Sequence, residues 1–143
     1  MSLSITRGSI MRIAIGSDHG GFELKQTVIQ HLEQKKIEVK DFGCYSDASV
    51  DYPDIALPVA EAVLSDDFDL GILICGTGIG ISITANKVKG IRCALCSDTF
   101  SAHATREHNN ANILAMGGRV VGPGLALDIV DAFLGGKFEG GRH

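Results

Sequence analysis

Two short segments of the chain combine reactive side chains with glycines. Residues 17–21 read Ser-Asp-His-Gly-Gly, and residues 75–80 read Cys-Gly-Thr-Gly-Ile-Gly. Each follows an apolar run and comes directly before a stretch with helical periodicity, where the first backbone amides of a helix are free to bind a ligand. The glycines allow the backbone itself to approach that ligand closely. We therefore expect both segments to contribute to a binding site.

Cys75 is the residue of this set best suited to chemistry. A thiol at the tip of a strand, facing the amides of a glycine loop and the start of a helix, should have its thiolate stabilised. The alternative is a buried structural cysteine beside a tight turn. Two nucleotide-binding motifs do not fit the same glycines. A dinucleotide fingerprint needs another glycine spacing, and a Walker loop needs Gly-Lys-Ser/Thr.

Asp18 and His19 form a second candidate pair. A carboxylate next to a histidine can hold the imidazole in one tautomer, so that the ring presents an N–H donor to an anion. The alternative is that Asp18 caps the following helix and His19 is an ordinary surface residue.

Further candidates lie near the end of a predicted helix and near the end of the chain. Residues 106–110 read Arg-Glu-His-Asn-Asn, where His108 could act as a general acid or base with Asn109 as an orienting donor. A histidine in the last turn of a helix also simply complements the helix dipole. Arg119 and Arg142 are candidates for phosphate recognition because arginine donates to phosphate in pairs of hydrogen bonds; a terminal arginine can equally be solvated.

Cys93 and Cys96 have the two-residue spacing of redox and zinc sites. They fall within a predicted strand, however, where they would point to opposite faces. No second Cys/His pair with ligand spacing accompanies them. We therefore expect core cysteines and no metal site.

The elements that must position these residues alternate between strand and helix. We predict strands at residues 12–16, 37–39, 70–75, 92–96 and 112–116, and helices at about 22–36, 57–64, 80–87, 98–109 and 124–134. The second helix is expected to carry Leu57, Ala60 and Leu64 on one face, and the last helix to turn Leu125, Ile129 and Ala132 inward.

This alternation predicts an α/β fold of the doubly wound, Rossmann-like kind, with a five-stranded parallel sheet and helices on both faces. The strand at 70–75 is apolar at every position, as expected when both faces of a sheet are covered. Ligands of such folds bind past the carboxyl ends of the strands, which is where residues 17–21, 75–80 and Arg119 fall.

Length and composition fit one globular domain. We assign residues 1–10 to an N-terminal extension and 11–143 to a single α/β domain, in a chain of 143 residues that is 45% hydrophobic. The net charge of −4 without a basic run argues against a nucleic-acid or anionic-membrane surface. No segment approaches the ~20 apolar residues of a membrane span. The four cysteines have no disulfide-framework spacing, so we predict a cytoplasmic protein.

Read in order, these segments resemble the ribose-5-phosphate isomerase B family, also called the ribose/galactose isomerase family. The similarity extends over residues 11–143, essentially the whole chain. It is carried by residues 12–21, 50–54, 72–83 with 85–87, 106–110 and 139–143. Any one segment is weak, but five in order at strand ends or the tail form a strong signal.

The resemblance implies an aldose–ketose isomerase that interconverts ribose 5-phosphate and ribulose 5-phosphate through a cis-enediolate. It implies Cys75 as the base, His108 as the ring-opening acid, and Thr77 within the loop that holds the enediolate. The positions implied to bind substrate are Asp18, His19, Tyr52, Gly76, Gly78, Ile79, Gly80, Asn109, Arg119 and Arg142. Neither a metal nor another cofactor is implied. Family members are homodimers, sometimes paired into tetramers, with active sites shared between subunits.

Two kinds of alternative stay open. Within the same chemistry, the substrate could be allose 6-phosphate or galactose 6-phosphate; members for pentose phosphates usually carry a further phosphate-facing arginine beyond the position of His143. In a different class, the chain could be a non-catalytic module that binds a phosphometabolite, since a fold does not fix a function. The presence of both Cys75 and His108 favours catalysis.

Overall fold

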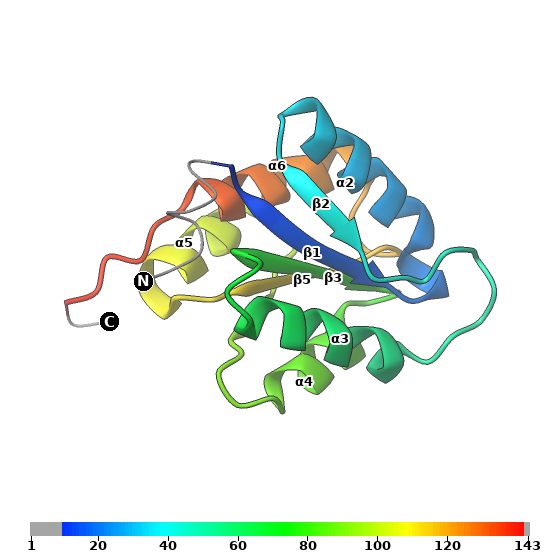
Figure 1. Cartoon of the computed structure of the whole chain (residues 1–143). Coiled ribbons are helices and arrows are strands. Elements are labelled where there is room, and N and C mark those ends of the chain that lie inside the picture. The colour runs from blue at the N-terminus through cyan, green and yellow to red at the C-terminus, as the bar shows by residue number, and fades with distance from the viewer. Residues whose placement is uncertain (1–9, 142–143) are drawn as a thin grey trace.

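The computed structural model describes residues 10–141 and is built around a five-stranded sheet (Figure 1). The strands are β1 (Arg12–Ser17), β2 (Glu38–Asp41), β3 (Leu70–Cys75), β4 (Cys93–Leu95) and β5 (Ile113–Gly117). All neighbours pair in parallel, in the order β2-β1-β3-β5-β4. The predicted five-stranded parallel sheet is therefore confirmed. Nearly all of the expected extension, residues 1–9, lies outside the described residues.

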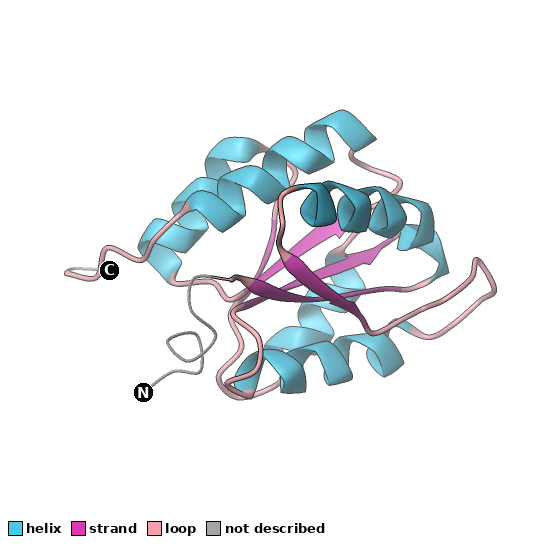
Figure 2. Cartoon of the chain, turned by 45° about the horizontal axis from the view of Figure 1, so that its top comes forward, coloured by secondary structure: helices cyan, strands magenta, loops and turns pink. Residues whose placement is uncertain are grey.

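Helices cover both faces of the sheet, as predicted (Figures 1 and 2). They are the 3₁₀ turn η1 (His19–Gly21) and the helices α2 (Phe22–Gln34), α3 (Tyr52–Leu64), α4 (Ile79–Asn86), α5 (Thr99–Asn109) and α6 (Pro123–Gly135). Helices α2, α5 and α6 pack on one face, and α3 and α4 pack on the other. Within residues 10–141, no helix combines the length and the apolar character needed to cross a membrane.

Strand β3 explains why one segment of the chain is apolar throughout. Ile72 and Ile74 point into the core beneath α2, α5 and α6, whereas Leu73 and Cys75 point into the core beneath α3 and α4. Because successive side chains of a strand alternate between faces, a central strand with two covered faces has no polar position. Cys75 is thus the last residue of a fully buried strand, and the glycine loop begins directly after it.

Two predicted helix faces are wrong in part. In α3, Ala60 is buried as expected, but Leu57 and Leu64 are exposed. The side chains that face the sheet are those of Ile55, Ala56, Val59 and Ala60. The helix begins at Tyr52, ahead of the predicted pattern, and packing against the sheet selects the stripe that contains Ala56 rather than Leu57.

Helix α6 shows the same kind of error. Ile129 is buried as predicted, and Ala132 packs at the margin of the core, but Leu125 is exposed. The inward positions are Ala126, Ile129, Val130 and Phe133. A helix with apolar residues at two neighbouring stripes leaves the choice of inward face to tertiary packing.

The boundary between α2 and β2 also differs from prediction. The helix ends at Gln34, and Lys36 takes the left-handed conformation at φ 65°, which turns the chain back toward the sheet. Strand β2 consequently runs from Glu38 to Asp41 rather than over residues 37–39. Within the described part of the chain it pairs only with β1, and it alternates between exposed and half-buried residues, as expected for the more exposed strand.

Candidate active site

The carboxyl ends of β1 and β3 lie at the point where the winding of the sheet changes direction. From β1 the chain crosses to β2 through α2 on one face, and from β3 it crosses to β4 through α4 on the other. A crevice for ligands forms at such a point. Ser17 pairs with Ile74 in the sheet, and the Asp18 N–H donates to the Ile74 carbonyl at 3.1 Å. Asp18 and Cys75 therefore leave the sheet side by side.

The loops that follow β1, β3 and β5 pack directly on one another. A Cβ atom at Gly20 would lie 3.0 Å from the backbone nitrogen of Gly76, and one at Gly118 would lie 2.6 Å from the carbonyl oxygen of Gly20. Gly20 was expected to let the backbone approach a ligand. In the structure, a side chain at Gly20 or Gly118 would clash with the backbone of a neighbouring loop. Glycine is therefore needed at both positions for the three loops to pack together.

Cys75 faces the amides of the glycine loop, as predicted. Its side chain is buried, and its Sγ accepts a hydrogen bond from the Gly78 N–H at 3.1 Å. The loop can turn back toward the sulfur because Gly78 has φ +81°. Thr77 Oγ1 accepts from the Ile79 N–H at 3.1 Å. The two side chains thereby bind backbone amides at the start of α4.

Asp18 and His19 have separate partners. The Asp18 carboxylate is buried and accepts from the Gly20 N–H at 2.9 Å, so it caps η1. His19 is exposed, and its Nδ1 accepts from the Val50 N–H at 3.3 Å. The prediction that Asp18 orients the His19 ring is therefore wrong, because the Asp18 carboxylate binds the Gly20 amide and the ring is bonded to the Val50 amide. An imidazole that accepts at Nδ1 carries its hydrogen at Nε2, where it can be donated to a ligand.

A cleft of about 680 Å³ opens beside these two residues. It is lined by Asp18, His19, Ser49, Val50, Asp51, Tyr52, Pro53 and Asp54. Tyr52, the first residue of α3, reaches across to the glycine loop, since a Cβ atom at Gly80 would lie 2.6 Å from Tyr52 Cζ. The structure thus brings together the predicted residues Asp18, His19, Tyr52 and Gly80.

Arg119 lies on the other side of the glycine loop. Its N–H donates to the Gly76 carbonyl at 3.0 Å, and its side chain passes along Gly76, with Nε 3.8 Å from the place of a Cβ atom. His19 and Arg119 also share a smaller hollow of about 270 Å³. A guanidinium and an imidazole N–H donor therefore border the same crevice, and both suit an anionic ligand.

His108 and Asn109 lie far from Cys75 in the same chain. Both end α5, which returns the chain to the amino ends of the strands. There the Asn112 carbonyl accepts from the N–H of Gly71, which is four residues, about 13 Å, from Cys75 along β3. His108 Nε2 lies 4.0 Å from the Glu139 carboxylate. Arg142 lies outside the described residues.

Sequence reasoning missed two contributors to this site. The amide of Val50 contacts His19 from 31 residues away, and no local pattern predicts a bond between a loop amide and a distant ring. Lys25 is completely buried at the base of the same loops. A signal for Lys25 was present, because this lysine lies next to Leu24 on the buried side of an amphipathic helix.

Cys93 and Cys96 behave as core residues. Cys93 packs against the core beneath α3 and α4, and Cys96 belongs to the opposite core, as predicted. Burial raises the pKa of Cys93 to about 12 and that of Cys96 to about 11. Neither thiol is therefore ionised at neutral pH. Across residues 10–141, no three His, Cys, Asp or Glu side chains form a group that could hold a metal.

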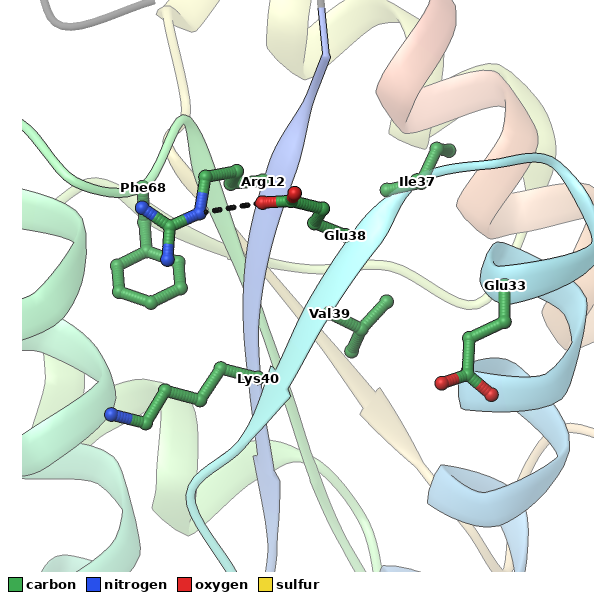
Figure 3. Close-up of a pocket in the computed structure, with 7 residues that line it drawn as sticks. All are labelled: Arg12, Glu33, Ile37, Glu38, Val39, Lys40 and Phe68. Carbon is green, nitrogen blue, oxygen red and sulfur yellow. Dashed lines mark ion pairs between the residues drawn. The ribbon is translucent and has the colours of Figure 1, made fainter. Parts of the chain in front are cut away.

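A separate hollow of about 330 Å³ lies across the edge strand β2 (Figure 3). It is lined by Arg12, Glu33, Ile37, Glu38, Val39, Lys40 and Phe68. Arg12 is engaged there by the Glu38 carboxylate at 3.0 Å and lies over the Phe68 ring. None of the predicted site residues lines this hollow, and its main cation is already paired.

The described geometry defines a doubly wound α/β protein with a thiol, a glycine loop and the side chains of His19 and Arg119 at its switch point. The chain belongs to the ribose/galactose isomerase family, whose model matches residues 13–143. The resemblance predicted from the sequence is therefore confirmed.

The similarity to named relatives covers nearly the whole chain. Ribose-5-phosphate isomerase B of Escherichia coli is 54% identical over 132 residues, covering 92% of this chain and 89% of that protein. A solved structure of Clostridium thermocellum ribose-5-phosphate isomerase B matches with a TM-score of 0.92 and 59% identity, covering 93% of this chain and 90% of the other. D-erythrulose-4-phosphate isomerase of Pectobacterium atrosepticum is 46% identical over 134 residues, covering 92% of this chain and 88% of that protein.

Proposed function

We propose that this chain is a ribose-5-phosphate isomerase that interconverts ribose 5-phosphate and ribulose 5-phosphate with Cys75 as the base. The observation that carries the proposal is the Cys75 thiol, bound by the Gly78 amide within the crevice of the three loops. The names of the Escherichia coli and Clostridium thermocellum relatives support the choice of substrate.

The chemical step moves one proton between neighbouring carbons. The Cys75 thiolate takes the proton from C2 of the open-chain aldose, and the electron pair left behind forms the C1–C2 double bond of an enediolate with charge on O1. The thiol then returns its proton to C1 while the proton of the O2 hydroxyl passes to O1, which leaves a ketone at C2 and a hydroxyl group at C1. The thiolate is regenerated, so the cycle closes without an oxidant or reductant.

The glycine loop stabilises the charge that develops in this step. Backbone amides in a fixed loop can face O1 without reorganising during the reaction. Thr77 adds a donor, because its oxygen already accepts from the Ile79 N–H and its own hydrogen is left to point into the crevice. Gly76, Gly78 and Gly80 keep the loop close enough to the sugar for these amides to reach it.

The phosphate and the hydroxyls bind at the borders of the crevice. His19 donates from Nε2, and Arg119 supplies a guanidinium beside Gly76; both suit the phosphate. Tyr52 and Asp18 line the cleft where the sugar hydroxyls lie. The resemblance adds Arg142 as a further phosphate contact.

A second copy of the chain supplies His108 and Asn109 in this proposal. Within one chain they lie at the amino ends of the strands, away from Cys75, whereas ring opening needs an acid at the sugar ring oxygen. Ile79 and Ile83 share an exposed face of α4, and Leu95 reaches the loop at Gly78. An apolar surface so close to the thiol suits a subunit interface, so we propose a homodimer with shared active sites.

The proposed activity is tested by following ribulose 5-phosphate formation from ribose 5-phosphate by the purified protein in the presence of EDTA. Turnover under these conditions would support a thiol isomerase that needs no removable metal. Allose 6-phosphate, galactose 6-phosphate and D-erythrulose 4-phosphate are tested beside it, since one relative is named for the last of these. Binding of ribose 5-phosphate without conversion of any sugar would favour the non-catalytic alternative.

A further inference from the structure

Lys25 is a buried cation that the proposed chemistry does not use. Its side chain has no exposed surface, and it lies in the first turn of α2, directly after the turn that carries His19. Both circumstances are unfavourable, because burial removes the hydration of the ammonium group and the helix dipole repels a cation at this end. The ammonium group must therefore be held by strong partners.

Three acceptors surround the Lys25 ammonium group. Nζ donates to both carboxylate oxygens of Asp41 at 2.7 Å and to the Cys44 carbonyl at 2.6 Å. These three bonds use every hydrogen that an ammonium group can donate. Lys25 thereby joins helix α2 to the end of β2 and to the start of the loop between β2 and α3.

The segment held by Lys25 is bonded in turn to the end of β1. Asp41 Oδ1 also accepts from the Gly43 N–H at 2.8 Å. The Gly43 carbonyl accepts from the Ser17 N–H at 2.7 Å, and the Cys44 N–H donates to the Ser17 carbonyl at 2.6 Å. Ser17 is the residue directly before Asp18. The bonds of Lys25 and Asp41 therefore lie next to the loop after β1, which carries Asp18 and His19.

The same loop continues into the wall of the substrate cleft. After Cys44 it passes beyond the carboxyl ends of β1 and β3 and returns to α3 at Tyr52 (Figure 1). On the way its Val50 amide bonds to His19, and residues 49–51 line the cleft. The start of this loop is held by the bonds of Lys25 and Asp41, by the two bonds to Ser17, and by a bond from the Phe42 N–H to the Ile15 carbonyl at 2.8 Å. The bonds of Lys25 are the ones that tie this segment to helix α2.

We propose that Lys25 is a positioning residue, which holds the β2–α3 loop so that the later residues of this loop orient His19 and form the wall of the cleft. This inference rests on the proposed function, because it concerns the geometry of the same site. Stability alone does not account for Lys25, since a buried ion pair is often no more stabilising than apolar residues of similar size. What the pair supplies is a fixed path for the loop.

The test compares Lys25→Met, which removes the ammonium group and keeps the length of the side chain, with Lys35→Met as the control. Lys35 lies just after α2 and pairs with Asp131 at the protein surface. Three quantities are measured well below the melting temperature: the exchange rate of the Cys44 amide hydrogen, the ¹⁵N chemical shifts of the His19 ring, and kcat and KM for ribose 5-phosphate.

For Lys25→Met we expect Cys44 amide exchange at least about tenfold faster than in wild type, with amides of β3 and β5 affected less. The His19 ring shifts should move toward those of a mixture of tautomers. We also expect kcat/KM to fall by about 100-fold, because small misplacements of positioning groups have effects of this size. Lys35→Met should resemble wild type in all three measurements.

Two results would overturn the proposal. One is a Lys25→Met protein whose His19 shifts and kcat/KM are those of wild type. The other is faster exchange of all amides alike with unchanged kinetics per folded molecule, which would make Lys25 a purely structural residue. If Lys25→Met does not fold, Asp41→Asn removes one acceptor more gently and is held to the same criteria. A wild-type protein without isomerase activity would contradict the proposed function, while amide exchange and His19 shifts would still decide the role of Lys25.

Discussion

Gly80 and Gly124 are each the second residue of a helix, in α4 and α6 respectively, but their surroundings differ. A Cβ atom at Gly80 would lie 2.6 Å from Tyr52 Cζ and 2.9 Å from its hydroxyl oxygen, whereas nothing lies within 4 Å of one at Gly124. The comparison separates the general effect of a Gly→Ala change in a helix from displacement of the tyrosine ring.

Gly80→Ala should therefore raise KM for ribose 5-phosphate about tenfold, because Tyr52 must leave the cleft wall to make room for the methyl group. Gly124→Ala should leave KM unchanged and increase the free energy of unfolding by up to about 1 kcal/mol. Steady-state kinetics and urea unfolding of both variants provide the measurement. Equal KM values for the two variants would contradict the role assigned to Tyr52.

Single residues of the site could be predicted where the signal is local. The place of Cys75 beside the amides of a glycine loop could be predicted, because a wholly apolar strand leads into that loop and a helix, and the bond from Gly78 follows from that order. His19 could be named, but its partner Val50 could not, since the contact crosses a loop without periodicity. Burial of Lys25 could have been predicted from its place beside Leu24 on the buried side of a helix, but its partner Asp41 could not, because Asp41 lies in another element.

At the scale of elements, α2 and α6 are joined at their ends by a charged cluster. The Asp131 carboxylate of α6 lies 2.8 Å from His31 Nε2 and 3.0 Å from Lys35 Nζ. Burial raises the pKa of Asp131, but the hydrogen bonds and charges of His31 and Lys35 outweigh it, so the net pKa lies below its ordinary value. A carboxyl whose pKa is lowered by folding stabilises the folded state only when it is ionised.

Asp131→Asn should accordingly reduce the free energy of unfolding at pH 6, by no more than about 1 kcal/mol because the cluster is partly exposed. The difference from wild type should be about the same at pH 5 and pH 6, and it should disappear as the pH falls through the folded pKa of Asp131, which lies below the unfolded aspartate value of about 3.9. Urea unfolding at pH 6 and below pH 3 measures it. A difference that grows toward low pH would show that the sign is wrong.

The order of elements was predictable, but the faces of some helices were not. All five strands and the alternation with helices follow from apolar runs and glycine positions. The inward faces of α3 and α6 depended on which of two adjacent apolar stripes meets the sheet, and Leu57 and Leu125 lie on the outer one. That choice is made by packing between elements, which the local pattern does not contain.

At the scale of the whole molecule, the separation of Cys75 from His108 within one chain leads to a test of subunit sharing. If each active site takes Cys75 from one subunit and His108 from the other, a mixed dimer of Cys75→Ala and His108→Ala has one intact site and one doubly altered site. Random pairing makes about half of the dimers mixed, so about a quarter of wild-type activity should return.

This experiment co-refolds the two inactive variants in equal amounts and compares their turnover with that of each variant alone. Recovery near a quarter supports shared sites. Activity no greater than the average of the two separate variants, in a mixture shown by native mass spectrometry to contain mixed dimers, would contradict them. Tetramer formation and a cytoplasmic location stay predictions from the sequence.

The central claim, that Cys75 is the base, is tested most directly by the rate of ribulose 5-phosphate formation in wild type and Cys75→Ala with EDTA present. Cys93→Ala is the matched control, because it removes a core thiol that burial keeps protonated. We expect kcat to fall at least about 100-fold in Cys75→Ala alone, with sugar-phosphate binding retained. Wild-type turnover in Cys75→Ala would contradict the mechanism.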